Sequence, residues 1–150
     1  MKTKIRQSSI HGLGLFADQM IPKDAEIWRF TPGFDRKLTR EDILAFPKAL
    51  QIWMYSYSWR SKKSKLYMLC PDDAKYINHA RPSNCVSVYR ADEDEVVTVA
   101  VRNISAGEEL TDDYDSFEDE RSEGDVLDEI AERYGLVDEL DPRFKVPSRT

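Results

Sequence analysis

Few residues in this chain could build a metal centre or a disulfide framework, because its 150 residues include two cysteines and two histidines. Cys70 and Cys85 lack the Cys-x-x-Cys spacing of zinc sites, and two cysteines are too few for a disulfide-stabilised secreted domain. Together with His11 and His79 they could form a metal site only if folding gathered all four side chains. Ordinary thiols are the simpler interpretation, so we expect no bound metal.

The sequence also lacks a long hydrophobic run. No apolar stretch approaches the roughly 20 residues that a membrane-spanning helix needs. Residues 1–6 are basic, but no apolar segment follows them, so the start does not resemble a signal peptide. The length is typical of one domain. We therefore expect a soluble, cytoplasmic protein without a membrane partner, or a nuclear one if the source is eukaryotic or viral.

The whole chain has a formal net charge of −6, and its negative charge is concentrated in the last third. Residues 112–141 contain fourteen acidic residues and two basic ones, whereas residues 1–111 carry a small positive excess. Such a segment disfavours direct binding of nucleic acid, because phosphate contacts need cations. It suits a basic protein or peptide partner, although a solvated helix face that keeps the protein soluble explains it equally well.

Alternating apolar and polar residues predict a mostly β chain with a few helices. The predicted strands are residues 4–8, 26–30, 55–59, 66–70, 86–89 and 95–101, with the last two forming a hairpin. Helical spacing begins after Thr39, an expected N-cap, and continues beyond Pro47, which either interrupts the helix or starts a second one. A last helix is predicted over residues 124–134, with Gly135 at its end.

Three short segments place polar, aromatic and glycine residues where a plain hydrophobic core would not need them. They read His-Gly-Leu-Gly-Leu-Phe-Ala at residues 11–17, Tyr-Ile-Asn-His-Ala-Arg-Pro-Ser-Asn-Cys at residues 76–85, and Gly-Glu-Glu-Leu-Thr-Asp-Asp-Tyr at residues 107–114. In this order and spacing they resemble the Gly-x-Gly element and the two signature motifs of the SET domain family, the fold of most protein lysine methyltransferases. The resemblance spans most of the chain.

The resemblance implies a SET-domain fold, with several small β-sheets around a pseudoknot, of the β-clip type. It implies S-adenosyl-L-methionine as the methyl donor and the ε-amine of a lysine as the acceptor. We expect residues 1–117 to form the SET domain and residues 118–150 to form an acidic helical extension that packs on it. No cysteine follows Cys85 in this sequence, so we expect no zinc-binding segment of the kind that follows many SET domains. This plan looks most like the small stand-alone SET proteins of bacteria.

Methyl transfer to lysine requires a neutral amine, although a lysine in water has a pKa near 10.4. An apolar, aromatic channel lowers that pKa, and alignment of nitrogen, methyl and sulfur then supplies much of the catalysis. The resemblance implies that Tyr114 is the catalytic residue, with its hydroxyl beside the transferring methyl. Without the motif around it, Tyr114 would more simply be a buried structural tyrosine.

The resemblance also implies which residues bind the cofactor. They are Leu13, Gly14, Leu15, Tyr76, Asn78, His79 and Tyr114. Phe117 closely follows the motif that ends at Tyr114, and we expect it to pack against the adenine of the cofactor or against the substrate channel. Glycine in the first motif allows the backbone to approach a ligand closely. We expect His79 to contact the cofactor and to hold the crossing of the two motifs by hydrogen bonds, not to act as a general base. We expect Asn84 to satisfy backbone groups at the same crossing.

For the substrate channel we expect Tyr57, Trp59 and Asp112. Tyr55 and Tyr67 are further candidates for its aromatic wall, and core packing is an equally good interpretation of each aromatic residue. Many histone-directed members have Phe or Tyr at the position of Asp112, where the side chain influences how many methyl groups are added. The expected substrate is a basic protein or peptide, such as a histone, a histone-like protein or a ribosomal protein.

Some positions depart from the family pattern. Ala80 stands where serine is usual, and Pro82 is displaced by one position. These departures, with the missing zinc segment, motivate an alternative in which the chain is a SET-like interaction module without catalysis. A homodimer that pairs through the C-terminal helix is a third possibility and is compatible with either function.

Overall fold

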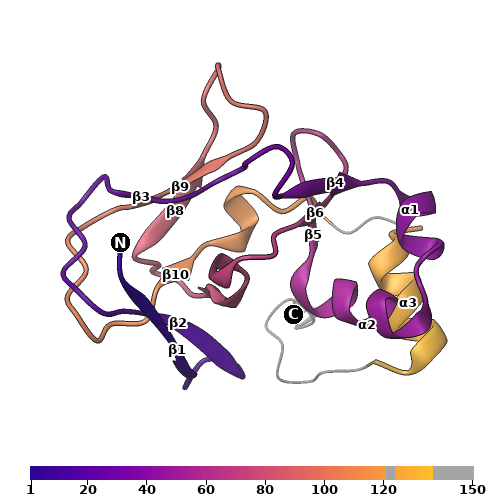
Figure 1. Cartoon of the computed structure of the whole chain (residues 1–150), viewed down its shortest axis with the longest axis horizontal. Coiled ribbons are helices and arrows are strands. Elements are labelled where there is room, and N and C mark those ends of the chain that lie inside the picture. Colours follow the sequence, from indigo (N-terminus) through magenta and orange to yellow (C-terminus); the bar gives the residue numbers. More distant parts are fainter. Residues whose placement is uncertain (121–123, 137–150) are drawn as a thin grey trace, which may run out of the picture.

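The computed structural model describes residues 1–120 and 124–136, and within them four small sheets and three helices divide the molecule into two ends. Figure 1 shows β1, β2, β3, β8 and β9 at one end and the three helices at the other. No helix within these residues is long and apolar enough to cross a membrane. The predicted fold class, mostly strands in several small sheets with few helices, is therefore confirmed.

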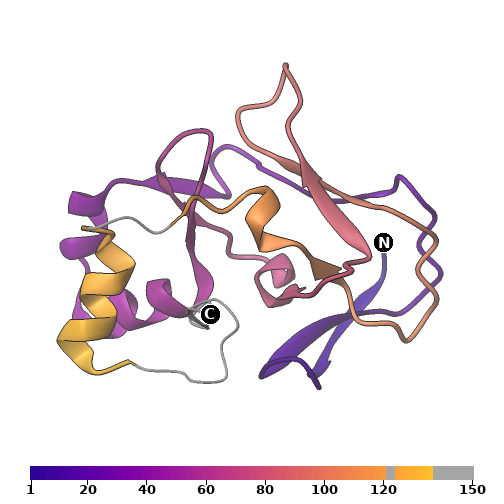
Figure 2. The ribbon, with the colours of Figure 1, turned by 180° about the vertical axis from the view of Figure 1, so that it is seen from behind.

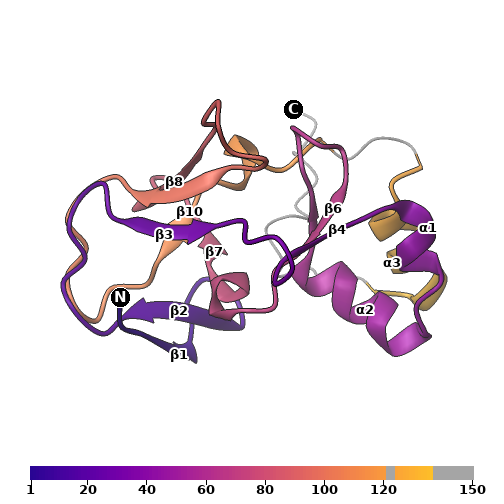
Figure 3. The ribbon, with the colours of Figure 1, turned by 45° about the horizontal axis from the view of Figure 1, so that its top comes forward.

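The strand-rich end contains a hairpin, a three-stranded sheet and a short parallel pair. The antiparallel hairpin joins β1 (Thr3–Gln7) to β2 (Leu13–Ala17). The three-stranded sheet has the order β3 (Glu26–Arg29), β9 (Val97–Ala100), β8 (Cys85–Val88), all antiparallel. The parallel pair consists of β7 (Asn78–His79) and β10 (Thr111–Asp112). Figure 3 shows this pair between the hairpin and the three-stranded sheet.

The helical end is attached through a second three-stranded sheet. Its antiparallel order is β4 (Arg36–Leu38), β6 (Tyr67–Leu69), β5 (Trp59–Arg60). The helices are α1 (Arg40–Leu44), α2 (Lys48–Tyr57) and α3 (Val126–Tyr134), and α3 contacts both others (Figure 2). Two 3₁₀ turns, η1 (Asp73–Tyr76) and η2 (Tyr114–Ser116), lie next to the strands of the parallel pair in sequence.

Side-chain hydrogen bonds and a glycine set the helix ends where the sequence predicts them. The Thr39 side chain accepts from the Asp42 N–H, and the Asp42 carboxylate accepts from the Thr39 N–H, which completes a capping box. Pro47 precedes α2, so it starts a second helix and does not interrupt one. Gly135 ends α3 with φ of 64°, a left-handed conformation that favours glycine.

The predicted strand over residues 55–59 is wrong, because α2 continues through Tyr57 and only Trp59 and Arg60 are extended. The alternation of aromatic and small polar residues indicated a strand. Burial favours the helix, because Met54 and Tyr55 pack in one apolar cluster with Ile130 of α3. A contact made by a helix about 75 residues further along the chain overrides the local pattern.

Candidate active site

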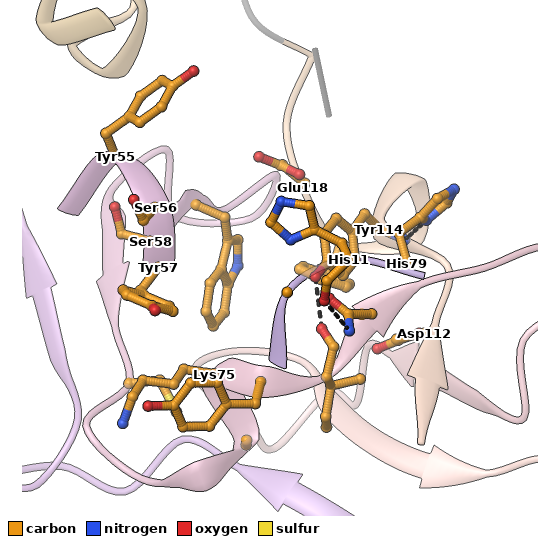
Figure 4. Close-up of a pocket in the computed structure, with 18 of the residues that line it drawn as sticks. His11, Tyr55, Ser56, Tyr57, Ser58, Lys75, His79, Asp112, Tyr114 and Glu118 are labelled. Atoms are coloured by element: carbon orange, nitrogen blue, oxygen red, sulfur yellow. Dashed lines mark hydrogen bonds between the residues drawn. The ribbon is translucent and has the colours of Figure 1, made fainter. Parts of the chain in front are cut away.

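A cavity of about 510 Å³ lies between the strand-rich end and the helices (Figure 4). The side chains expected to hold a cofactor contribute six of its lining residues: Leu13, Tyr76, Asn78, His79, Tyr114 and Phe117. The three residues expected in a substrate channel, Tyr57, Trp59 and Asp112, line the same space. Gly14 and Leu15 do not line it. Folding thus brings residues from both signature motifs and from α2 to one cavity.

The two signature motifs meet side by side at the parallel pair. Thr111 lies opposite Asn78 and Asp112 lies opposite His79, and the Ala80 N–H donates to the Asp112 carbonyl at 3.2 Å. Asn84 then ties the chain across this pair. Its Oδ1 accepts from the Thr111 N–H at 2.9 Å, and its Nδ2 donates to the Glu109 carbonyl at 2.7 Å. Asn84 therefore satisfies backbone groups, as the sequence predicted, and Ala80 does not prevent the crossing.

Tyr114 begins the 3₁₀ turn η2, two residues after β10 ends, and lines the cavity. Its hydroxyl donates to the Ile77 carbonyl at 2.6 Å, and its backbone N–H donates to His79 Nδ1 at 3.1 Å. The ring packs against His79 and Phe117, with centroids 5.2 and 5.5 Å away. The hydroxyl is held in one orientation, with its proton directed at a carbonyl and its oxygen in the cavity.

His79 is held as a neutral acceptor. Burial lowers the pKa of its imidazole, although the nearby Asp113 carboxylate acts in the opposite direction. Because Nδ1 already accepts the Tyr114 N–H, the remaining proton sits on Nε2. To act as a base, His79 would have to give up the hydrogen bond that places Tyr114. This hydrogen bond joins the two signature motifs, as expected for a histidine that holds their crossing and does not act as a general base.

Glu109 contacts a cavity residue, Asn78, and the sequence analysis did not predict this contact. Its Oε1 accepts from Asn78 Nδ2 at 2.8 Å, and both of its oxygens accept from the Ser8 hydroxyl. The Asn78 amide also lies 3.1 Å from the carbonyl oxygens of His11 and Leu13. Glu109 therefore joins the three motifs at the cavity's edge. The available signal was a second charged residue, after Glu108, beside the buried Leu110.

Gly14 leaves room for a neighbouring side chain. The close approach is by the Glu109 side chain, because a Cβ at Gly14 would lie 2.2 Å from Glu109 Oε1. Leu15, its neighbour in β2, is buried in an apolar cluster with Ile77 and Leu110. The glycine that both lines the cavity and adopts positive φ is Gly12, at the hairpin turn.

We expect Gly14→Ala to lower the free energy of unfolding by about 1–3 kcal/mol, the usual cost of overpacking. The added methyl would displace Glu109 from Asn78 and Ser8. Chemical denaturation of the single variants and of the Gly14→Ala, Glu109→Ala double variant measures the effect. The cost of the alanine should shrink when Glu109 is truncated. An equal cost in both backgrounds would contradict this explanation.

Aromatic side chains form one continuous wall of the cavity. Tyr114, Phe117, Trp59 and Trp28 contact one another in that order, with successive centroids 5.5, 5.4 and 5.8 Å apart. Tyr57 packs edge-on against Tyr76 at 5.8 Å. Trp28 was not predicted, since it lies outside all three motifs. The wall can pack against apolar groups and favour cations at its ring faces.

The other two aromatic candidates belong to the helical core. The Tyr67 hydroxyl accepts from the Val126 N–H at 3.1 Å, and Tyr67 does not line the cavity. Tyr55 lines its edge, but its ring packs in the helical cluster and its hydroxyl donates to the Leu136 carbonyl at 3.2 Å. Figure 4 shows Tyr55 apart from Tyr114 and His79.

Asp112 is the buried acidic group of the cavity, with 3% of its surface exposed. Its Oδ2 accepts from the Ser87 hydroxyl at 2.6 Å, and its Oδ1 accepts from the Asp113 N–H at 2.8 Å. Burial raises the pKa of its carboxyl to about 6, because these hydrogen bonds offset only part of the loss of water. In the described residues, no cluster of three or more histidine, cysteine or acidic side chains could hold a metal ion.

Comparison with known proteins identifies one family, a curated relative in two organisms and a solved structure. The family model described as "SET domain" matches residues 12–115. Histone-lysine N-methyltransferase 2D from human and from mouse is 28% identical over 120 residues, which cover 78% of this chain. The chain spans about 2% of the length of these curated relatives.

A solved structure shares the fold. It is a Plasmodium falciparum protein described as a candidate histone methyltransferase, 21% identical to this chain, with a TM-score of 0.51. The likeness covers 75% of this chain and 92% of the other. At this identity the comparison speaks for the fold alone, and it agrees with the arrangement of small sheets described above.

Proposed function

Because this chain belongs to the SET domain family, we propose that it transfers a methyl group from S-adenosyl-L-methionine to the ε-amine of a lysine in a basic protein. The observation that carries the proposal is the Tyr114 hydroxyl, held against the Ile77 carbonyl inside an aromatic cavity. Both signature motifs contribute to this arrangement through β7 and β10. The curated relatives, which are named as histone-lysine methyltransferases, support the same reaction.

The chemistry of the cavity fits a cationic methyl donor. The donor supplies an electrophilic methyl group on a positively charged sulfonium. Aromatic faces and oxygen acceptors favour such a charge, and the cavity offers both. The rings of Trp59, Phe117 and Tyr114 supply the aromatic faces, and the Tyr114 hydroxyl supplies an oxygen. Its volume of about 510 Å³ is within the usual range for small-molecule sites. Leu13, Tyr76, Asn78 and His79 are the residues we assign to holding the donor.

Tyr114 would orient the reacting groups. Its proton is directed at the Ile77 carbonyl, and its oxygen would accept weak C–H···O contacts from a polarised methyl. The His79 ring and the Tyr114 backbone fix each other through one hydrogen bond. Such fixed geometry supports in-line attack, because alignment contributes several kcal/mol to a two-reactant step.

The aromatic wall would accept the lysine side chain. Tyr57, Trp59 and Tyr76 surround the approach with apolar ring surface, and desolvation there disfavours an ammonium. The long methylene chain of lysine is apolar and packs well on such rings. We assign Tyr57 and Trp59 to this channel.

Charge supports a basic substrate less directly than the sequence suggested. Three acidic residues of the segment already pair with basic side chains of the same chain. Arg81 pairs with Asp113 and Asp115, and Asp119 pairs with Arg60 and Lys65. The acidic groups that line the cavity, Asp112 and Glu118, are the ones placed to meet a substrate amine. The relatives named as histone-lysine methyltransferases add weight to a histone or similar basic protein.

We further propose that residues 1–117 form the catalytic domain and that residues 118–150 close its cavity. α3 packs on α1 and α2, and Gly135 and Leu136 after it line the cavity. Residues 137–150, which the division also includes, lie outside the described residues. A homodimer through the C-terminal helix would have to use a surface of α3 other than the one packed in this core.

The proposal is tested first by titrating S-adenosyl-L-methionine into the purified chain by calorimetry. We expect binding at micromolar strength, equivalent to about 8 kcal/mol. Transfer of a labelled methyl group to histones, histone-like proteins or ribosomal proteins then tests the reaction. The same proteins with acetylated lysines are the matched control and should remain unlabelled. Absence of binding, even with a basic peptide present, would favour a SET-like interaction module without catalysis.

A further inference from the structure

Asp112 is a buried carboxylate at one end of the cavity without a positively charged partner in the described part of the chain. Both of its oxygens accept from neutral donors, the Ser87 hydroxyl and the Asp113 N–H. Ser87 is hydrogen-bonded in turn to Thr98 at 2.8 Å, and both residues line the cavity. One end of a largely aromatic space therefore carries a cluster of oxygen atoms. Figure 4 shows Asp112 at the same end as Tyr114.

The groups around Asp112 do not neutralise it. From β7, His79 faces it as a neutral imidazole, since burial lowers the pKa of that ring. From β8, Cys85 is a neutral thiol, because burial raises its pKa. Asp113, next in the chain, is negative and pairs with Arg81. The strand β9 contributes Thr98, which does not titrate. A buried carboxylate in such surroundings is costly unless a ligand supplies the positive charge.

We propose that Asp112 binds the ammonium group of the incoming lysine and accepts its proton before methyl transfer. The inference rests on the proposed function, since it assigns the amine end of that cavity. Asp112 directly opposes His79 and is two residues from Tyr114, so its carboxylate lies beside the groups assigned to the methyl. An aromatic passage that ends in oxygen acceptors matches an alkylammonium, apolar along its chain and charged at its tip.

The step balances without a further reactant. One N–H bond of the ammonium breaks, its electron pair stays on nitrogen, and the proton forms an O–H bond with Asp112. The neutral nitrogen then forms a bond to the methyl carbon while the carbon–sulfur bond breaks and its electrons remain on sulfur. Asp112 releases its proton to water after the product leaves. Burial raises the pKa of the carboxyl and lowers that of the amine, which reduces the free-energy cost of this proton transfer within the bound ion pair.

The other polar groups at this end are less suited to accept the proton. His79 uses Nδ1 for the Tyr114 N–H, and Tyr114 donates its own hydroxyl proton to Ile77. Lys75 lines the cavity as a cation, with its Nζ 4.8 Å from the Tyr76 ring centroid. Ser87 and Thr98 are alcohols, which are too weakly basic. Asp112 has the required charge, position and burial together.

Binding of the amine can be measured without turnover. The pKa of the Asp112 carboxyl is followed by NMR of carbon-13-labelled protein, with the signal assigned by its loss in Asp112→Asn. We expect n-butylammonium to lower this pKa by about 1 or more, as a nearby opposite charge does. The neutral analogue n-butanol, which has the same chain, should not lower it. No difference between the two probes would overturn the inference.

Proton acceptance has its own signature in the pH profile of kcat/KM. In the wild type we expect a plateau between about pH 7 and 9, because ionised Asp112 accepts the proton. In Asp112→Asn the rate should fall about 100-fold at pH 7 and recover about tenfold per pH unit, since only the neutral amine fraction reacts. Asp113→Asn, which alters the adjacent paired carboxylate, is the control and should keep the plateau.

The outcomes separate the two claims. A loss in Asp112→Asn that is the same at every pH would overturn proton acceptance. A wild-type chain without methyl transfer that still shows the n-butylammonium effect would support the amine site and overturn the proposed function. Methyl transfer by a chain that does not show the n-butylammonium effect would support the proposed function and overturn the amine site at Asp112.

Discussion

Replacing Tyr114 with phenylalanine is expected to lower kcat for methyl transfer by roughly 100- to 1,000-fold, similar to loss of one preorganised polar group in other active sites. The change removes the hydroxyl that donates to the Ile77 carbonyl and leaves the ring packed against His79 and Phe117. The oxygen that we place beside the methyl is lost, while the shape of the cavity is kept. Labelled methyl transfer under saturating donor measures the effect.

The design of this test separates catalysis from folding and from donor binding. Calorimetry on Tyr114→Phe should give a dissociation constant within a few fold of the wild type, because the variant loses only weak C–H···O contacts and keeps Leu13, Tyr76, Asn78 and His79. Tyr89→Phe makes the same chemical change at an exposed tyrosine outside the cavity and should retain full activity. Unchanged methyl transfer in a folded Tyr114→Phe protein would remove Tyr114 from the catalytic step and with it the main support for the proposed function.

Local signals in the sequence predicted most of the elements. Thr39 and Gly135 identified helix ends because capping depends on a few adjacent residues. The hairpin β8–β9 followed from two alternating segments joined by an acidic turn. The motifs predicted that Asn78, His79 and Tyr114 share a site, and the parallel pair brings them to one cavity.

Long-range contacts explain what local signals could not predict. The end of α2 depends on packing with α3, and no pattern within residues 55–59 contains that information. Glu109 contacts Asn78, and Trp28 lines the cavity, only when the hairpin and the sheet β3–β9–β8 are placed around the parallel pair. The roles of the site residues remain predictions, to be decided by the variants described here.

The charge that the acidic segment presents to a partner also could not be predicted from the sequence. Counted along the sequence, it forms a negative arm suited to basic partners. In the folded chain, Arg81, Arg60 and Lys65 neutralise Asp113, Asp115 and Asp119, which lie 32 to 59 positions away. Net charge is additive along a sequence, but the charge available to a partner depends on which residues pair after folding.

Asp112→Asn is expected to stabilise the protein at neutral pH even though it should impair methyl transfer. Folding raises the pKa of the Asp112 carboxyl from 3.8 to about 6, so an ionised Asp112 costs roughly 3 kcal/mol of folding free energy above pH 6. Asparagine is neutral and can replace both hydrogen bonds. Its Oδ1 can accept from the Asp113 N–H, and its Nδ2 can donate to Ser87, which then donates to Thr98.

The pH dependence gives this prediction its sign. Below about pH 3.8 the carboxyl is protonated in both the folded and unfolded states, so the charge costs nothing and the variant gains nothing from losing it. Between pH 3.8 and 6 the unfolded state loses its proton first, and the stability of the wild type falls relative to the variant. Urea unfolding at pH 4 and pH 7.5 should therefore show an advantage for Asp112→Asn that grows by about 2–3 kcal/mol.

Asp113→Asn provides the matched comparison, because its carboxylate is partly exposed and paired with Arg81. Its effect on unfolding should stay within about 0.5 kcal/mol, as for most surface substitutions. If Asp112→Asn were less stable than the wild type at pH 7.5, the carboxylate would be contributing to the fold and its burial would need no ligand to explain it. A stabilised but catalytically impaired variant would instead mean that the protein retains a destabilising charge at the position where we expect the substrate amine to bind.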